Sequence, residues 1–156
     1  MEINIPGRGI IKIKHLLLDF NGTIACDGKV IPAVKEKIEE INNKGITVQV
    51  VTADTHGTVK AQCVSMPVEI QIFDNSNAAE NKRAIVEKLG AEQCICIGNG
   101  FNDGQMFEAC SVSIIVIGEE GCSAKSLMKA DVVCKNIGDA FELILKPSRM
   151  IATLRG

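Results

Sequence analysis

Short apolar runs alternate with amphipathic segments along most of the chain. A short run that is rich in Leu or β-branched residues and bounded by turn residues is typical of a strand buried on both faces. The segments that we interpret as strands are 16–18, 46–51, 69–73, 94–97, 113–117 and 132–134. Because helical segments separate them, these strands predict a mostly parallel sheet with right-handed crossovers.

The segment 32–44 is the clearest helix in the sequence. Val34, Ile38 and Ile41 fall on one helical face. A proline at its start suits the first turn, and a glycine after it suits the position beyond the end.

The segment 77–89 predicts a second long helix. Asn77 followed by Glu80 is the pattern of an N-terminal capping box, and Gly90 predicts the end of the helix. Further helices are expected at 57–64, 102–110, 122–130 and 138–146.

Both ends of the chain differ from this alternation. Residues 1–15 predict a β-hairpin around a Pro-Gly-Arg-Gly turn. Residues 147–156 are expected to form a C-terminal tail or an added edge element. We find no internal repeat, low-complexity segment or linker, so the pattern predicts one α/β domain over 1–156, with a doubly wound, three-layer, Rossmann-like sheet.

Composition supports a single domain with an aliphatic core. The chain has 156 residues, of which 46% are hydrophobic, and it has no Tyr or Trp. Lys and Arg number 17 against 19 Asp and Glu, without a basic run, so no nucleic-acid or membrane partner is expected.

The cysteines and the first residues predict a cytoplasmic protein. The opening segment lacks the apolar region of a signal peptide. Cys94, Cys96 and Cys134 lie inside predicted strands, which favours buried, reduced thiols over a disulfide framework.

Polar residues follow several predicted strands directly. The junctions are Asp19–Thr23, Val51–Thr55 and Gly98–Asp103. Ligands of such sheets bind beyond the carboxyl ends of the strands. A carboxylate there can act as a nucleophile or hold Mg²⁺, and hydroxyl and loop amide groups can bind phosphate oxygens.

These junctions resemble the motifs of the haloacid dehalogenase (HAD) superfamily. Asp-Phe-Asn-Gly-Thr at 19–23 resembles D-x-D-G-T, and also the D-K-T-G-T motif of P-type ATPases. Thr-Ala-Asp at 52–54 is similar to the T-G-D of those pumps, and Lys82 stands where the third-motif lysine is expected. Gly-Asn-Gly-Phe-Asn-Asp at 98–103 resembles G-D-G-x-N-D. The set and its order resemble the soluble P-type-ATPase-like members of the superfamily.

The resemblance implies a role for each matching residue. It implies a Mg²⁺-dependent phosphohydrolase or phosphotransferase with Asp19 as the nucleophile and with a phosphorylated small molecule or protein as substrate. The implied catalytic residues are Asp19, Asn21 and Lys82, and the implied phosphate-binding residues are Gly22, Thr52, Ala53 and Lys82. The implied metal ligands are Asp19, the backbone carbonyl of Asn21, Asn99, and Asp103 through a water molecule. The supporting residues are Thr23 and Asn102.

Two positions depart from the family pattern. Asn21 stands where phosphatases of the superfamily have an acid/base, and an amide does not titrate. Asn99 replaces the first Asp of the fourth motif, which predicts weaker Mg²⁺ binding. Asp54 or His56 is an alternative source of the missing acid.

The chain has little room for a cap domain. Only a short flap fits at 24–30, and 52–82 has room for one helix and one strand. Because capless members of the superfamily commonly act on large substrates or assemble into oligomers, the resemblance implies a large substrate or a homo-oligomer that covers the open site. Because two acids are replaced, a non-catalytic phosphate- or metal-binding module is the alternative function.

Overall fold

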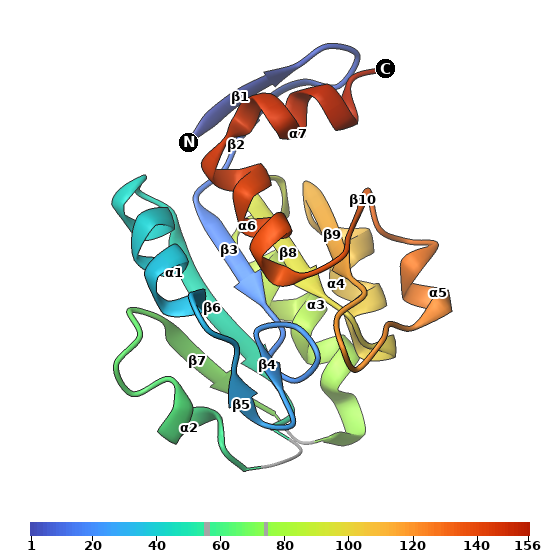
Figure 1. The fold of residues 1–156 in the computed structure, drawn as a ribbon. Helices are drawn as coiled ribbons and strands as arrows, with labels where there is room; N and C mark the ends of the chain where they lie inside the picture. The colour runs from blue at the N-terminus through green and yellow to red at the C-terminus, as the bar shows by residue number, and fades with distance from the viewer. Residues whose placement is uncertain (55–56, 74) are drawn as a thin grey trace.

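The computed structural model describes residues 1–54, 57–73 and 75–156. In these ranges a six-stranded sheet has the order β10-β9-β8-β3-β6-β7, and all its neighbouring strands are parallel (Figure 1). Its strands are β3 (His15–Leu18), β6 (Thr47–Thr52), β7 (Glu69–Ile72), β8 (Cys94–Gly98), β9 (Val112–Val116) and β10 (Val132–Cys134). The predicted doubly wound α/β fold is confirmed.

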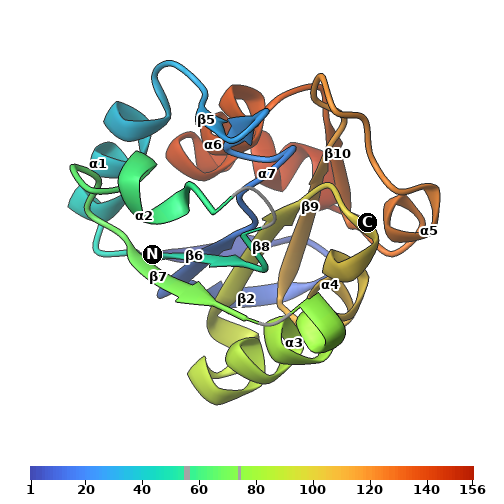
Figure 2. The same cartoon turned by 90° about the horizontal axis from the view of Figure 1, so that it is seen from below.

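Helices cover both faces of the sheet. One face carries α1 (Val34–Asn43) and α6 (Ile137–Leu145), and the other carries α3 (Ala78–Leu89) and α4 (Gly104–Ala109), as Figure 2 shows from the edge where the strands end. Short elements complete the connections: α2 (Val59–Gln62), α5 (Ala124–Leu127) and the 3₁₀ turns η1 (Asn75–Asn77), η2 (Ala91–Gln93) and η3 (Phe101–Asp103). Among the described residues, no helix is long and apolar enough to cross a membrane.

Alternate side chains of the central strand build two separate cores. Leu16 and Leu18 of β3 belong to the cluster on the α1 and α6 side, whereas Leu17 packs with Val86 and Phe107 on the α3 and α4 side. The strand cysteines, Cys94, Cys96 and Cys134, are buried as predicted.

The register of the sheet aligns the strand ends that carry the polar motifs. Leu18 of β3 pairs with Val50 of β6 on one side and with Ile97 of β8 on the other. Because the three strands are parallel, their carboxyl ends open at one rim. The connection from β3 to β6 uses one face of the sheet and the connection from β7 to β8 uses the other, so the rim at β3 is the topological switch point.

The N-terminal hairpin forms a sheet of its own at the opposite end of the domain (Figure 1). It consists of β1 (Glu2–Ile5) and β2 (Gly9–Lys12). The expectation of a tail or edge element at 147–156 is wrong, because residues Pro147–Leu154 form helix α7. Met150 and Leu154 of α7 are buried in one cluster with Ile3 and Ile5 of β1.

The predicted flap is present, and no domain is inserted in the described chain. β4 (Ala25–Cys26) and β5 (Lys29–Val30) form a small antiparallel hairpin beside the rim. Between β6 and α3 the described residues hold only α2, β7 and η1.

Some predicted helix starts need correction. Asn77 precedes α3, but its side chain makes no capping hydrogen bond, so the predicted capping box is absent. Helix α1 begins at Val34 rather than at Pro32, because Ala33 has a left-handed backbone with φ +66°. The segment predicted as one helix from residue 102 begins as the 3₁₀ turn η3.

Candidate active site

Asp19 lies directly after the central strand, at the switch point of the sheet. The residue is 7% exposed, and its backbone N–H donates to the carbonyl of Ile97 in β8 at 2.9 Å. One carboxylate oxygen accepts from Lys82 at 2.6 Å, and the other lies 3.5 Å from the Thr23 hydroxyl. The carboxylate is therefore held firmly beneath the rim.

Lys82 joins the first and fourth sequence motifs. Its ammonium lies 2.6 Å from Oδ1 of Asp19, 2.6 Å from Oδ1 of Asp103 and 3.3 Å from Oδ1 of Asn102. These partners use all three donors of the ammonium. The side chain is completely buried, so Lys82 is part of the site and not a solvated helical lysine.

The position of Lys82 on α3 explains this burial. Ala78, Lys82 and Val86 are the buried residues of the helix, and they are spaced by four, so they lie on one face. Arg83 and Lys88 of the same helix do not lie on this face. The sequence signal that distinguishes Lys82 from them is therefore its spacing of four from the apolar residues Ala78 and Val86.

Asp103 uses both carboxylate oxygens inside the protein. Oδ1 accepts from Lys82, and Oδ2 accepts from the backbone N–H groups of Asn99 at 2.9 Å and Gly100 at 2.8 Å. The residue is completely buried. Asp103 thus shapes the loop after β8 and orients Lys82, so any contact with a metal ion would have to be indirect.

Asn99 is fixed by partners on both atoms of its amide. Its Oδ1 accepts from the Thr23 hydroxyl at 3.2 Å, and its Nδ2 donates to the carbonyl of Gly121 at 3.0 Å. Gly22 adopts φ +75°, and a Cβ there would lie 2.1 Å from Asn99 Nδ2. Only glycine therefore allows the loop after β3 to approach the loop after β8 this closely.

Among the described residues, no group donates a hydrogen bond to the buried side-chain oxygen of Asn21. The next residue, Gly22, closes the turn that contains Asn21, because its N–H donates to the carbonyl of Ala25 at 2.8 Å. A buried acceptor without a donor is unfavourable unless a ligand satisfies it. Asn21 also lines the rim cavity.

Thr52 and Ala53 lie at the same rim, where β6 ends. The Thr52 hydroxyl accepts from the backbone N–H of Asp54 at 3.0 Å. Asp54 itself accepts from the N–H groups of Thr58 and Val59 at 2.9 and 3.2 Å, so its carboxylate caps α2. His56, the other candidate for the missing acid, lies outside the described residues.

A cavity of about 320 Å³ brings most of the predicted site residues together. It is lined by Asp19, Asn21, Thr52, Ala53, Asn99, Gly100, Phe101 and Asn102. Phe101, which the sequence did not single out, is 69% exposed at the mouth, with the Lys125 ammonium 5.6 Å from the centre of its ring. Lys82 and Asp103 lie behind this surface and support it.

The buried charges favour a bound cation near Asp19. Burial raises the pKa of the Asp19 carboxyl to about 6, although the Lys82 ammonium lowers it. Burial alone would lower the pKa of Lys82, but Asp103 and Asp19 outweigh it and hold the pKa above its usual value. One ammonium therefore faces two carboxylates.

The oxygen atoms at the rim are suitable ligands for a hard divalent cation. Asp19 supplies a carboxylate and Asn99 supplies an amide oxygen. Asn21, whose backbone carbonyl is the ligand that the resemblance implies, lines the same cavity. Carboxylate and amide oxygens suit Mg²⁺. The residues fit such an ion, with fewer negative charges than the usual family pattern.

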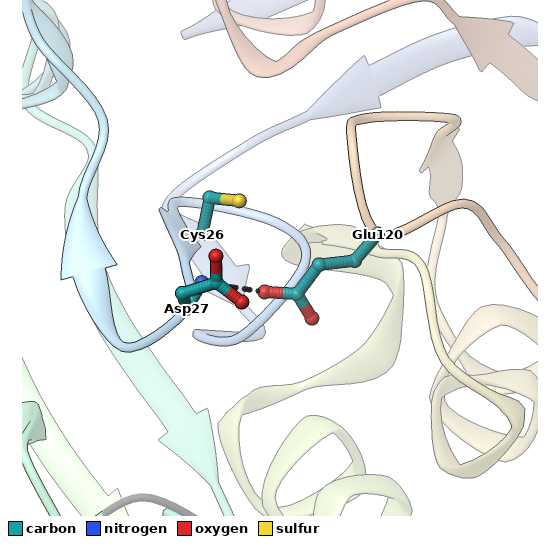
Figure 3. Close-up of side chains that lie close together, drawn as sticks. All are labelled: Cys26, Asp27 and Glu120. Atoms are coloured by element: carbon teal, nitrogen blue, oxygen red, sulfur yellow. Dashed lines mark hydrogen bonds between the residues drawn. The ribbon is translucent and has the colours of Figure 1, made fainter.

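A larger and mostly apolar cavity of about 500 Å³ lies on the other side of the Gly22–Thr23 turn, between the flap and α6. At its edge Cys26, Asp27 and Glu120 converge, with their ligand atoms within 4.8 Å of one another (Figure 3). The backbone N–H of Asp27 donates to Glu120 at 2.8 Å, which ties the flap to the loop after β9. Asp19 and Thr52 do not line this cavity, so the chemistry of the rim belongs to the smaller one.

Comparisons with known proteins find two relatives in Methanocaldococcus jannaschii. An uncharacterized protein is 36% identical over 94 residues, which cover 58% of this chain and 99% of that protein. A soluble P-type ATPase-like phosphatase is 25% identical over 126 residues, which cover 80% of this chain but 46% of that protein. No family model matches the chain.

Solved structures of similar fold include several phosphatases. A 3-deoxy-D-manno-octulosonate 8-phosphate phosphatase from Moraxella catarrhalis, in complex with magnesium and phosphate ions, has a TM-score of 0.68 at 20% identity and covers 92% of this chain and 94% of that one. The cobalt-bound form of a deoxy-D-mannose-octulosonate 8-phosphate phosphatase from Haemophilus influenzae has a TM-score of 0.72 at 14% identity, and the match covers 93% of this chain and 94% of that one. A putative HAD-superfamily hydrolase from Legionella pneumophila has a TM-score of 0.71 at 15% identity, and the match covers 92% of this chain and 88% of that one.

The sheet topology, the two relatives and the fold neighbours agree with the resemblance stated from the motifs. The chain has the fold of haloacid dehalogenase-like hydrolases, with no inserted cap domain among the described residues, and it is similar in sequence to a soluble P-type ATPase-like phosphatase.

Proposed function

We propose that this protein is a Mg²⁺-dependent phosphatase or phosphotransferase that acts through a phospho-Asp19 intermediate. The observation that carries the proposal is the position of the Asp19 carboxylate, which lines the rim cavity while Lys82 and Thr23 hold its oxygens. A carboxylate fixed at the switch point of an open sheet is suited to nucleophilic attack on phosphorus.

The neighbouring groups are suited to an anionic substrate. Thr52 and the backbone at Ala53 would offer donors to phosphate oxygens, because both residues line the cavity. Gly22, the other phosphate-binding residue that the resemblance implies, lines the larger cavity instead, and its N–H donates to the carbonyl of Ala25. Lys82 places a positive charge beside the attacked group. Asp103 orients that lysine, and Asn102 accepts its third hydrogen bond.

Mg²⁺ would be held by Asp19, Asn99 and Asn21, with Asp103 supporting the site indirectly. When bound, the ion would neutralise negative charge on the transferring phosphoryl group. Magnesium and cobalt ions in the related phosphatases support this assignment. A phosphorylated small molecule is the substrate that these neighbours favour, and a homo-oligomer that covers the open rim is consistent with the absence of an inserted domain in the described chain.

The test is Mg²⁺-dependent release of phosphate from acetyl phosphate and p-nitrophenyl phosphate by the parent and by Asp19→Asn. We expect the variant to lose all measurable turnover while it keeps the parent's thermal unfolding midpoint within a few degrees. Equal rates for variant and parent would refute the proposal.

Asn21 and Asn99 favour a second candidate function, a module that binds phosphate or metal without chemistry. Intact-mass analysis after incubation with acetyl phosphate separates the two. A phosphate adduct on the parent that is absent from Asp19→Asn supports the enzyme, whereas phosphate binding without any adduct or turnover supports the module.

A further inference from the structure

Phe101 is a large apolar side chain that the proposed mechanism does not use. The residue is 69% exposed, whereas Phe20, Phe107 and Phe141 are buried in the two cores. Exposed apolar side chains that stand alone are common on protein surfaces. Of the large hydrophobic residues that are exposed in the described chain, however, Phe101 is the one that shares a cavity with Asp19. Its ring is therefore within reach of a ligand that occupies this cavity.

The loop that carries Phe101 is held on both sides. Two backbone N–H groups just before Phe101 donate to the Asp103 carboxylate, and the Phe101 carbonyl accepts from the Ser126 hydroxyl at 3.3 Å. The ammonium of Lys125 lies 5.6 Å from the centre of the ring, which is a distance typical of a cation–π contact. A side chain on such a loop loses little freedom when a ligand packs against it.

A second cavity, of about 310 Å³, lies next to the rim cavity. Phe101 and Asn102 line both cavities. The second cavity also has polar side chains from η1, α3 and α4, which are Asn77, Glu80 and Gln105. A group attached to a phosphate in the rim cavity can therefore extend over the Phe101 ring into a polar hollow.

This combination suits a flat heterocyclic ring. The face of a phenylalanine ring attracts another aromatic ring, and a base of any identity can stack on it. Amide and carboxylate groups, such as those of Asn77, Gln105 and Glu80, can pair with donors and acceptors on the edge of a heterocycle. The negative charge of Glu80 also disfavours a further anionic group in the second cavity. A nucleoside monophosphate combines one phosphate with an uncharged heterocycle.

We infer that the substrate is a phosphate ester that carries a heterocyclic base, as a nucleoside monophosphate does, and that the base stacks on Phe101 beside the second cavity; this inference rests on the proposed function. Phe101 then determines which phosphates bind, and it does not touch the reacting atoms. Because the stack is equally strong in the bound substrate and in the transition state, it lowers KM and leaves kcat unchanged.

The experiment compares adenosine 5′-monophosphate (AMP) with ribose 5-phosphate, which has the same phosphate ester but no base. Each compound is measured as a competitive inhibitor of the Mg²⁺-dependent hydrolysis of acetyl phosphate, so an inhibition constant Ki is obtained whether or not the compound is itself cleaved. In the parent we expect Ki for AMP to be lower than Ki for ribose 5-phosphate by roughly 5- to 150-fold, which is the worth of one stacked base.

Variants of Phe101 separate stacking from simple apolar contact. Phe101→Ala should raise Ki for AMP to the value for ribose 5-phosphate, and it should leave Ki for ribose 5-phosphate and kcat/KM for acetyl phosphate unchanged. Phe101→Trp keeps an aromatic face and should keep the preference for AMP, whereas Phe101→Leu keeps apolar bulk and should lose most of it. The matched control is Val64→Ala, a truncation of a side chain that is 84% exposed and lines a different hollow, and it should change none of these constants.

Two outcomes overturn the inference. One is an equal Ki for AMP and ribose 5-phosphate in the parent. The other is a loss of affinity in Phe101→Ala that is as large for ribose 5-phosphate as for AMP, because the ring would then hold the loop and not the base. Neither outcome affects the proposed function, which depends on the loss of acetyl phosphate turnover in Asp19→Asn. If the parent releases no phosphate at all, the proposed function fails, and titration calorimetry of the two compounds with Mg²⁺ still decides whether Phe101 binds a base.

Discussion

The ammonium of Lys82 lies 2.6 Å from one oxygen of Asp103, while the other oxygen of that carboxylate accepts from the backbone of the loop after β8. This contact joins helix α3 to the fourth motif. The ion pair holds the Lys82 ammonium beside Asp19, and it holds the loop that carries Asn99. The geometry of the whole rim therefore depends on this ion pair.

Lys82→Met should destabilise the protein strongly, because it leaves the buried Asp19 and Asp103 carboxylates without their cation. Breaking a buried pair by removing one partner costs about 3–5 kcal/mol. Urea unfolding measures the loss. Lys88→Met, at an exposed position of the same helix, should change stability by less than about 0.5 kcal/mol. Equal stabilities of the two variants would contradict the central role of Lys82.

Gly22→Ala should be more harmful than Gly45→Ala, although both glycines have nearly the same backbone angle, φ +75° and +78°. The left-handed conformation costs an L-residue roughly 1–2 kcal/mol at either site. At Gly22 the new Cβ would also overlap Asn99, whereas at Gly45 no atom of the described residues lies within 4 Å of such a Cβ. We expect an extra loss of about 1–3 kcal/mol at Gly22, measured by urea unfolding. A similar cost at both sites would show that the Asn99 side chain can move aside.

Asn99→Asp should strengthen Mg²⁺ binding, because it adds a carboxylate to a site in which Asp19 is the charged ligand. We expect Kd from titration calorimetry to fall roughly tenfold, which corresponds to about 1.4 kcal/mol. The change also removes the donor to the Gly121 carbonyl, so the metal-free variant should lose about 1 kcal/mol of stability. Asp19→Asn should weaken Mg²⁺ binding. An unchanged Mg²⁺ affinity in both Asn99→Asp and Asp19→Asn would exclude these two residues as ligands.

Glu142 should make the protein sensitive to acid. Lys146 and Lys37 lower the pKa of its carboxyl to about 2 through hydrogen bonds. A depressed pKa stabilises the folded state above the unfolded value of about 4.3, and this contribution is lost as the pH falls towards 2. The gap in melting temperature between the parent and Glu142→Gln should therefore be largest near pH 6 and should close by pH 2–3. A gap that is constant across this range would contradict the assignment.

The parallel sheet and the rim could be predicted because the buried strands are short apolar runs, and polar residues follow them at once. Lys82 was harder to place, because an isolated lysine on a helix is usually solvated. Its burial depends on two carboxylates from other segments, Asp19 and Asp103, which meet it only in the folded chain. The position of the Asn99 side chain was equally hard to predict, because its hydrogen-bond partners Thr23 and Gly121 are distant from it in the sequence.

Helix α7 was missed although its pattern was present. Pro147 stands at the start, and Met150, Ile151 and Leu154 have helical spacing. The segment is short, and its stability comes from packing on the hairpin rather than from its own propensity. Phe101 was also missed, since nothing in the sequence distinguishes an exposed phenylalanine from the buried Phe20 and Phe141.

The packing of α7 against β1 has a consequence for the synthesis of the protein. Ile3 and Ile5 are synthesised almost a whole domain before Met150 and Leu154, the side chains that cover them. During synthesis the apolar face of the hairpin therefore stays uncovered until α7 has been made. Folding of the domain can be completed only after residue 154 has emerged from the ribosome, when the rim loops are already present.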